Sequence, residues 1–497
     1  MTPLAAFVEA LGRTGGDRIA AVRRAAEAVA SDPWRVVEEA GWLARCDVAV
    51  ATSDLGLVPG TLRVRGVDAP GVVPIGQGAP YPVRPGGSRK RRGAFDTPRT
   101  LARQVVASTL RVAERCDTGM DLACGPGAFL VALAEAGIEQ LVGRDIDAVA
   151  IEVARIAVPD ADLAVADGLA ATATADVVVG NPPFVPPERQ DKEYRAELRR
   201  RFPWLHGRFD LAVPFAAVAV DACRSGGAVG LVLPAPILVQ PYGAALRRGW
   251  VLRHHLVAVA DPEAFAGASV EVTVVVLRPG AGPARLPNGI DPERLAELPA
   301  VPLDPALREG DLELAAAVRG SSVPLETLAL VDTGVVAHGP GRGRQHLLFD
   351  EPGEGRVPYA DAAEFFAGRR RWLAYRPEEM HRAKKPSMFE GDKIVVQRVR
   401  GRGQPVRAAI DRDGVYVGHT CTVVVPGPDA PPLTRLLELV RSPVAHGVLR
   451  VERGRRMDVY PRDIGALPVP RTWLEGSGAK AWPLTASQRE RLEALGR

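Results

Sequence analysis

The sequence has few cysteines, few aromatic residues and no long run of uncharged apolar residues. Its five cysteines form no Cys-x-x-Cys pair, which argues against a disulfide framework and against a zinc site. No window of about 18 uncharged apolar residues is present, so a membrane span is not expected. The N-terminal stretch carries Glu9 and lacks the apolar core of a signal peptide. We therefore expect a cytoplasmic protein without a membrane segment or a metal.

The length and composition indicate several ordinary folded domains. The chain has 497 residues, of which 46% are hydrophobic and 25% charged, and its formal net charge of +4 is too small to identify a partner. Shifts in composition divide it into an N-terminal helical and irregular region, a central domain, a linker rich in Pro and Glu, and a C-terminal region. These four segments are residues 1–88, 89–280, 281–325 and 326–497.

The central domain alternates strand-like and helix-like segments. Runs rich in Val and Leu, such as the one before Asn181, are separated by stretches with helical spacing of apolar residues. This alternation predicts an α/β fold, a mostly parallel sheet with helices on both faces. In the C-terminal region, residues 393–426 predict successive strands around an Asp413-Gly414 turn, followed by a helix. We expect this region to be α+β and rich in strands.

A glycine-rich turn and three aspartates mark the central domain as a candidate nucleoside-binding domain. The turn contains Gly125 and Gly127, and it follows Asp121 at the end of a predicted strand. Asp145 and Asp167 end the next two strands, where carboxylates can accept from ribose hydroxyls and from an adenine amino group. The third glycine of the dinucleotide fingerprint is missing, which argues against NAD. The structural alternative is that each Asp only caps the turn or helix after it.

The tetrapeptide Asn181-Pro182-Pro183-Phe184 ends the following strand. Two consecutive prolines can neither continue a strand nor enter a helix interior, so the segment is rigid. The side-chain oxygen of Asn181 and the carbonyl of Pro182 form a pair of acceptors that would favour the nucleophilic form of a planar amino nitrogen. Phe184 offers a flat face for a base. The structural alternative is a strand-ending turn with a buried Phe.

Together with the element Gly93-Ala94-Phe95-Asp96-Thr97-Pro98, these motifs resemble the S-adenosylmethionine-dependent methyltransferases with a Rossmann-like class I sheet. More narrowly, they are similar to the gamma-type (Taq-like) N6-adenine-specific DNA methyltransferases, although Leu122 stands where that family usually has Pro. The resemblance implies that Thr97 and the turn hold the methionine end of S-adenosyl-L-methionine, Asp145 its ribose and Asp167 its adenine. The full cofactor-binding set that it implies is Phe95, Thr97, Pro98, Asp121, Ala123, Cys124, Gly125, Gly127, Asp145, Ile146, Asp167, Gly168, Asn181 and Phe215.

The same resemblance implies the chemistry. The catalytic residues would be Asn181, Pro182, Pro183 and Phe184, acting on the N6 amino group of an adenine flipped out of duplex DNA. The flipped base would stack on Phe184 and on Phe265, for which a place in the core is the alternative. Enzymes that methylate RNA bases or protein glutamine carry the same tetrapeptide, so the motif indicates a planar amide or amino nitrogen more firmly than DNA adenine.

Basic clusters indicate a nucleic-acid partner. Residues 361–420 hold thirteen Lys and Arg against eight Asp and Glu. Residues 326–497 resemble, loosely, the DNA target-recognition domains of the family. The DNA-contact candidates are Arg89, Lys90, Arg91, Arg92, Lys384, Lys385, Arg398, Arg400 and Arg402. We expect an adenine-specific DNA methyltransferase of a restriction–modification or defence system, with a cognate restriction or defence-system protein as a further partner. An RNA base methyltransferase and a non-catalytic DNA-binding subunit are the alternatives.

Overall fold

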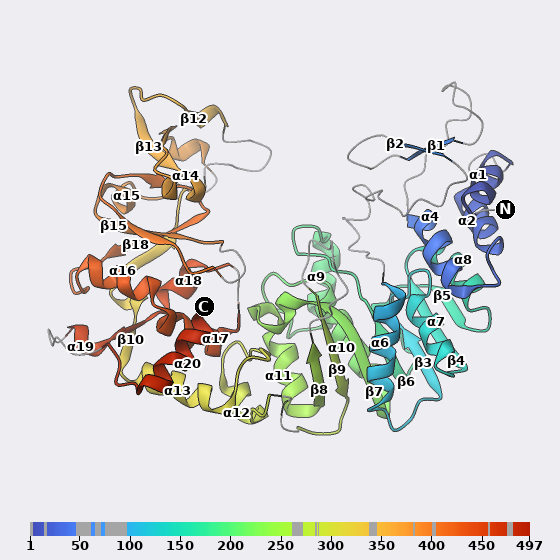
Figure 1. Cartoon of the computed structure of the whole chain (residues 1–497). Helices are drawn as coiled ribbons and strands as arrows, with labels where there is room; N and C mark the ends of the chain where they lie inside the picture. Colours follow the sequence, from blue (N-terminus) through green and yellow to red (C-terminus); the bar gives the residue numbers. More distant parts are fainter. Residues whose placement is uncertain are drawn as a thin grey trace. The chain divides into compact units, whose positions relative to one another are not determined.

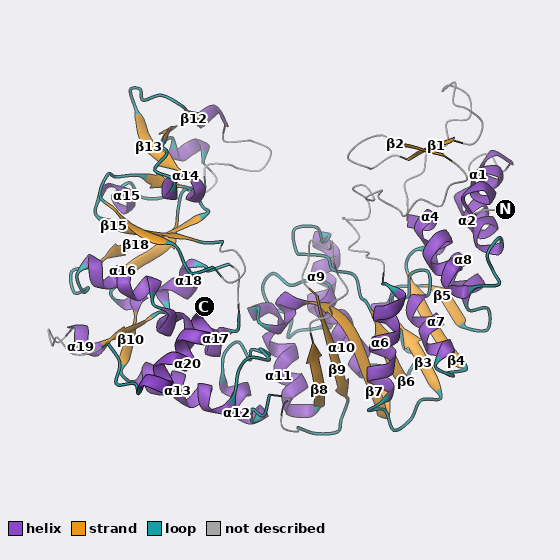
Figure 2. Cartoon of the chain, viewed as in Figure 1, coloured by secondary structure: helices purple, strands orange, loops and turns teal. Residues whose placement is uncertain are grey.

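The chain forms two compact units, residues Met1–Glu297 and Leu298–Arg497. The computed structural model describes residues 3–13, 17–45, 61–64, 71–74, 97–260, 272–283, 286, 288–336, 345–380, 383–399, 404–455, 458–474 and 481–497. Figure 1 follows the chain by colour, and Figure 2 separates helices from strands. No helix in these ranges is both long enough and apolar enough to cross a bilayer.

The first unit is built on a seven-stranded sheet in the order β5-β4-β3-β6-β7-β9-β8. The strands are β3 (Thr118–Asp121), β4 (Gln140–Asp145), β5 (Asp162–Val165), β6 (Ala175–Gly180), β7 (Cys223–Pro234), β8 (His255–Ala260) and β9 (Val272–Arg278). The strands from β5 to β7 run parallel, whereas β9 pairs antiparallel with both of its neighbours. The sheet is therefore mostly parallel, as the alternating sequence pattern predicts (Figure 2).

Helices connect these strands and cover the sheet. They are α6 (Arg99–Leu110), α7 (Ala128–Glu135), α8 (Ala148–Ala157), η2 (Gly168–Ala170), α9 (Lys192–Arg201), α10 (Ala212–Asp221), η3 (Ala235–Leu238), η4 (Pro241–Gly243) and α11 (Ala244–Arg253). From β3 the chain steps outward through α7 to β4 and through α8 to β5, whereas from β6 it steps the other way through α10 to β7. Because such crossovers are right-handed, α7 and α8 lie on one face and α10 on the other. The switch point lies between β3 and β6, where ligands bind beyond the carboxyl ends of the strands.

The N-terminal helices pack on this domain. They are α1 (Pro3–Arg13), α2 (Arg18–Glu27), α3 (Pro33–Arg35), η1 (Val36–Ala40) and α4 (Gly41–Arg45). Arg23 forms an ion pair with Glu152 of α8, and the Trp34 indole N–H donates to Glu135 of α7 at 2.8 Å. Helix was predicted for this region. Beyond it, β1 (Thr61–Val64) pairs antiparallel with β2 (Gly71–Pro74).

The segment predicted as a linker, residues 281–325, is instead folded in large part. It contains α12 (Pro292–Glu297), α13 (Glu309–Gly320) and β10 (Ser322–Pro324), and the division between the two units falls within it. Leu295 and Leu312 are buried. The frequent Pro and Glu residues favoured a linker, although the apolar positions of two helices in the segment have helical spacing.

The second unit contains two four-stranded sheets, in agreement with the strand-rich prediction. One sheet has the order β11-β18-β15-β16 and the other β12-β14-β13-β17. Their strands are β11 (Ala329–Thr333), β12 (Leu348–Phe349), β13 (Arg356–Ala360), β14 (Arg371–Ala374), β15 (Lys393–Gln397), β16 (Ala408–Asp411), β17 (Tyr416–Val417) and β18 (Cys421–Pro426). Tyr359, Leu373 and Phe389 are buried in a core between them. The predicted turn at Asp413-Gly414 is present, with Gly414 at a φ of 67°.

Helices and short segments complete this unit. They are η5 (Leu325–Thr327), η6 (Gln345–Leu347), α14 (Ala362–Phe366), η7 (Pro377–Glu379), α15 (Ser387–Glu390), α16 (Leu433–Arg441), α17 (Pro443–Arg453), α18 (Pro461–Gly465), α19 (Arg471–Leu474) and α20 (Ala486–Gly496). The predicted helix that follows the strands corresponds to α16 and α17. A last strand, β19 (Pro468–Pro470), pairs antiparallel with β10.

Candidate active site

The glycine-rich turn leaves the carboxyl end of β3 and is held by two aspartates. The Asp121 carboxylate, at the end of the strand, accepts from the Ala123 N–H at 2.9 Å. The Asp145 carboxylate, at the end of β4, accepts from the Gly125 N–H and from the Asp147 N–H, both at 2.8 Å. Gly125 and Gly127 have φ values of 53° and 100°, a region that side chains disfavour. The Asp145 carboxylate therefore helps to hold the turn in place.

Asp167 brings the end of the next strand to the same edge. One of its oxygens accepts from the Leu169 N–H at 2.9 Å, and the other accepts from the Tyr194 hydroxyl at 3.0 Å. Gly168 packs so closely that a Cβ there would lie 1.8 Å from the carbonyl oxygen of Leu122. Only glycine fits this approach. The three aspartates expected at successive strand ends thus lie around one turn.

Asn181 follows β6 at the switch point. Its side-chain amide N–H donates to the Thr97 hydroxyl oxygen at 3.2 Å. Its side-chain oxygen is buried and has no hydrogen-bond partner within the described ranges. Thr97 and Asn181 are 84 residues apart in the chain, so the fold brings the Thr-Pro element to the tetrapeptide. A buried acceptor without a donor is costly, and it marks a place where a ligand donor would be favoured.

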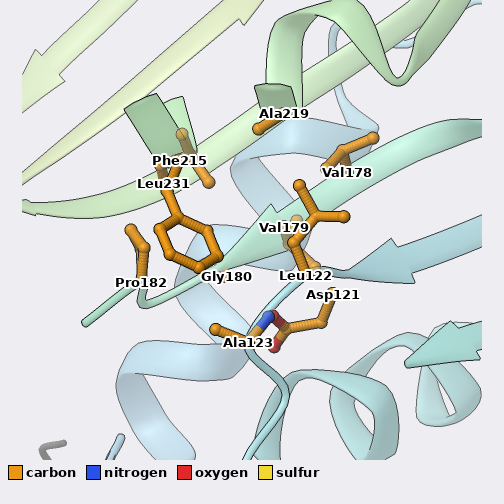
Figure 3. A pocket seen from close by; sticks show the side chains of 10 residues that line it. All are labelled: Asp121, Leu122, Ala123, Val178, Val179, Gly180, Pro182, Phe215, Ala219 and Leu231. Atoms are coloured by element: carbon orange, nitrogen blue, oxygen red, sulfur yellow. The ribbon is translucent and has the colours of Figure 1, made fainter. Parts of the chain in front are cut away.

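A small pocket that is partly open to solvent lies between these segments. Figure 3 shows the Phe215 ring projecting from α10 toward Gly180 and Pro182, with Asp121 and Ala123 of the turn on the other side. Leu122, Val178, Val179, Ala219 and Leu231 complete the lining. The structure thus brings Phe215, which the resemblance placed against the cofactor, to the turn and the tetrapeptide.

The tetrapeptide and the residues after it are tightly held. Phe184 is only 6% exposed, so the faces of its ring are covered in this state. A base can stack on the ring only if one of these faces is uncovered. The Gln190 side-chain amide donates to the carbonyls of Val185 and Phe209 at 2.8 and 2.7 Å. The Leu211 N–H donates to the Val185 carbonyl at 3.1 Å. We call residues 185–190 the acceptor loop, because they follow the proposed acceptors Asn181 and Pro182. The buried side chain of Gln190, at one end of this loop, binds the carbonyl of Val185 at the other end.

Burial changes the protonation of two groups at the turn. It raises the pKa of Asp121 to about 7, with a smaller contribution from the nearby Asp145 charge. Burial also raises the pKa of the Cys124 thiol well above its usual range. The thiol therefore stays protonated at neutral pH and is a poor nucleophile. Within the described ranges, no group of three or more His, Cys, Asp or Glu side chains could hold a metal ion.

Several predicted residues lie outside the described ranges. They are Arg89, Lys90, Arg91, Arg92, Phe95, Phe265, Arg400 and Arg402. Among the DNA-contact candidates that are described, Lys384 pairs with Asp332 at 2.5 Å and Lys385 is exposed. The Arg398 guanidinium donates to the His419 carbonyl at 2.8 Å and lies over the Tyr460 ring. Lys384 and Arg398 thus have contacts within their own unit.

Two residues at the site were not singled out from the sequence. Tyr194 reaches Asp167 from α9, and Gln190 ties the acceptor loop together. Asp191, which caps α9, signals the start of that helix in the sequence. No sequence signal shows that the helix folds back to the end of β5, because this depends on tertiary packing.

Two family models match this part of the chain. The Eco57I restriction-modification methylase model matches residues 159–264, and the methyltransferase small domain model matches residues 99–201. The first range contains Asp167, the tetrapeptide and Phe215, and the second contains the turn and all three aspartates.

Similar proteins match over short segments. The chain is 32% identical to the Type II methyltransferase M.PaeR7I of Pseudomonas aeruginosa over 116 residues, which are 22% of this chain and 20% of the relative. It is 30% identical to the Type II methyltransferase M.XhoI of Xanthomonas vasicola over 167 residues, 30% of each chain. The chain therefore matches less than a third of the length of either relative.

A solved structure extends the likeness of fold. The Type IIL restriction-modification enzyme MmeI, determined in complex with DNA, superposes with a TM-score of 0.50 at 14% identity, covering 80% of this chain and 66% of that one. An identity this low speaks for the fold alone. Sheet order, turn and matches together show the class I S-adenosylmethionine-dependent methyltransferase fold, with S-adenosylmethionine as its cofactor. Over parts of its first unit, the chain is thus similar in sequence to restriction–modification methyltransferases.

Proposed function

We propose that this protein methylates the N6 amino group of adenine in double-stranded DNA after the base has been flipped out of the duplex, in a restriction–modification system. The observation that carries the proposal is the side-chain oxygen of Asn181, which is buried and has no hydrogen-bond partner among the residues that the structure describes. A target amino group would supply the missing donor.

The acceptor pair accounts for activation of the amine. The lone pair of an exocyclic amine is delocalised into the ring, which makes the nitrogen a poor nucleophile. Hydrogen bonds from its two N–H groups to the Asn181 oxygen and the Pro182 carbonyl favour a more tetrahedral nitrogen with a localised lone pair. The Thr97 hydroxyl holds the amide N–H end of Asn181, so the oxygen end points away from it. No strong base is needed, because the proton can leave after the transfer.

The residues around the turn fit S-adenosylmethionine, which supplies a methyl group on a cationic sulfur when bound. Asp145 and Asp167 place carboxylates at the turn and at the end of the next strand, and carboxylate oxygens are acceptors suited to the ribose hydroxyls and the adenine amino group. Ile146, next to Asp145, is 68% exposed and offers an apolar surface to the adenine ring. Thr97, Asp121 and the turn would surround the methionine end.

Asp121 predicts a pH dependence of cofactor binding. A cationic ligand beside this carboxylate lowers its pKa from about 7, so binding releases a proton where the carboxyl of the free protein is protonated. We expect the affinity for S-adenosylmethionine to rise about 10-fold between pH 6 and pH 8, as the ionised fraction of Asp121 rises. Titration calorimetry across this range measures it.

Asp121→Asn is the control for that profile. The asparagine oxygen can still accept from the Ala123 N–H, but it does not titrate. The ionisation of the cofactor's own amino group contributes to both pH profiles, so subtracting the Asp121→Asn profile from the wild-type profile removes that contribution. A wild-type profile that coincides with that of the variant would contradict a role for Asp121 at the cofactor. The raised pKa of Asp121 has the opposite effect on the stability of the free protein. The folded protein binds the carboxyl proton more tightly than the unfolded chain, so the free energy of unfolding falls as pH rises from 3.8 to about 7.

The partner assignment is tested by offering several polymers. Labelled S-adenosylmethionine is incubated with the whole protein and duplex DNA, transfer and ribosomal RNA, or a protein fraction. We expect label in DNA only. Label only in RNA would favour the RNA base methyltransferase, which the shared tetrapeptide also permits. Label in no polymer, with intact cofactor binding, would favour a non-catalytic DNA-binding subunit.

A further inference from the structure

The contact between Tyr194 and Asp167 has no counterpart in the motifs of the sequence. The tyrosine hydroxyl donates to one carboxylate oxygen at 3.0 Å, while the other oxygen accepts from the Leu169 N–H at 2.9 Å. Burial, and then the Asp167 charge, raise the pKa of Tyr194, so its hydroxyl remains a donor at neutral pH. The carboxylate is thus held at both oxygens, and each keeps a lone pair for a third donor.

Tyr194 is itself firmly placed. It lies in the first turn of α9, where the Asp191 side chain caps the helix by accepting from the N–H groups of Glu193 and Tyr194 at 2.9 and 3.0 Å. The Arg195 guanidinium donates to the Pro187 carbonyl at 2.7 Å and ties the same turn to the acceptor loop. The start of α9 is thereby fixed both to the end of β5 and to the loop that follows Asn181.

We propose that Tyr194 is a positioning residue for the cofactor: it holds Asp167 in the orientation that reads the adenine amino group of S-adenosylmethionine. The proposal rests on the proposed cofactor role of Asp167. Without the hydroxyl, the carboxylate keeps one anchor and can rotate toward water. Tyr194 also joins the cofactor's adenine site to the acceptor loop through a single helical turn.

Tyr194→Phe in the full chain tests this, because it removes the hydroxyl and keeps the ring. Dissociation constants are measured without nucleic acid for S-adenosylhomocysteine and for S-inosylhomocysteine, in which an oxygen replaces the adenine amino group. We expect Tyr194→Phe to weaken S-adenosylhomocysteine binding about five-fold, the effect of one hydrogen bond, and to leave S-inosylhomocysteine binding unchanged. Equal weakening of both ligands, or of neither, would overturn the proposal.

Two further variants separate the possible failures. Tyr242→Phe, at another half-buried tyrosine of the same unit, is the matched control and should change neither constant. Asp167→Asn should abolish the discrimination between the two ligands, and adding Tyr194→Phe to it should have little further effect. If Asp167→Asn leaves the discrimination intact, both the cofactor role of Asp167 and the proposal for Tyr194 fall. If only Tyr194→Phe lacks an effect, the role of Asp167 stands. These readouts do not depend on which polymer is methylated.

Discussion

Asn181→Ala is expected to lower the rate constant of methyl transfer at saturating cofactor by about 100- to 1,000-fold, the range seen when one preorganised polar group at a reacting centre is lost. The amide nitrogen of Asn181 donates to Thr97, whereas the amide oxygen has no partner within the described ranges. The variant therefore removes an acceptor that this part of the protein does not itself use. Single-turnover transfer to DNA measures the rate constant, and calorimetric titration measures the affinity for S-adenosylmethionine. Cofactor binding should stay nearly unchanged.

Asn181→Asp is a graded companion to that variant. The aspartate keeps an acceptor for the amine and can accept from the Thr97 hydroxyl in place of the lost amide donor. We therefore expect it to retain more activity than the alanine. Asn288→Ala, at the other described asparagine of the chain, is the control and should transfer normally. Loss of cofactor binding in Asn181→Ala would show that the residue is structural.

Lys393→Met is expected to destabilise the second unit by about 3–5 kcal/mol, the usual result of removing one partner of a buried ion pair. Lys393 is fully buried opposite Asp411 in the β15–β16 pair, and its ammonium donates to the Asp411 carboxylate and to the Phe389 carbonyl. The variant leaves a buried carboxylate without its counter-charge. Calorimetric unfolding of the whole chain should show one transition lowered, with cofactor binding by the first unit retained.

The partner residue distinguishes the ion pair from simple packing. The Asp411 carboxylate also accepts from the Val415 N–H at 2.9 Å, so Asp411→Asn keeps an acceptor for the turn while removing the charge. We expect the double variant Lys393→Met with Asp411→Asn to recover part of the lost stability. Lys385→Met, at an exposed position, should have no effect on unfolding. A double variant less stable than Lys393→Met alone would contradict this account of the pair.

Features written in local sequence were predictable. The strand-and-helix alternation gives the sheet, because each run carries its own periodicity. The position of Asp121, Asp145 and Asp167 after successive runs implies one edge of the sheet, because parallel strands share their carboxyl ends. The folded segment around Leu295 and Leu312 was missed because its Pro-rich composition outweighs two short helical patterns.

Features that depend on distant packing were not predictable. Thr97 was expected at the cofactor and Asn181 at both the cofactor and the target, and nothing in either motif shows that the two side chains bond to each other. Tyr194 and Gln190 lie in a charged stretch whose sequence is typical of an ordinary surface helix and the loop before it. The burial of Phe184 likewise follows from the surrounding fold, although the tetrapeptide itself is evident.

The nucleoside product tests the central claim most directly. Duplex DNA is methylated by the whole protein with labelled S-adenosylmethionine, digested to nucleosides and separated by chromatography with mass detection. The proposal predicts that all label is in N6-methyl-2′-deoxyadenosine. Label in a methylated cytosine would contradict the interpretation of Asn181 and its tetrapeptide as an acceptor site for the adenine amino group.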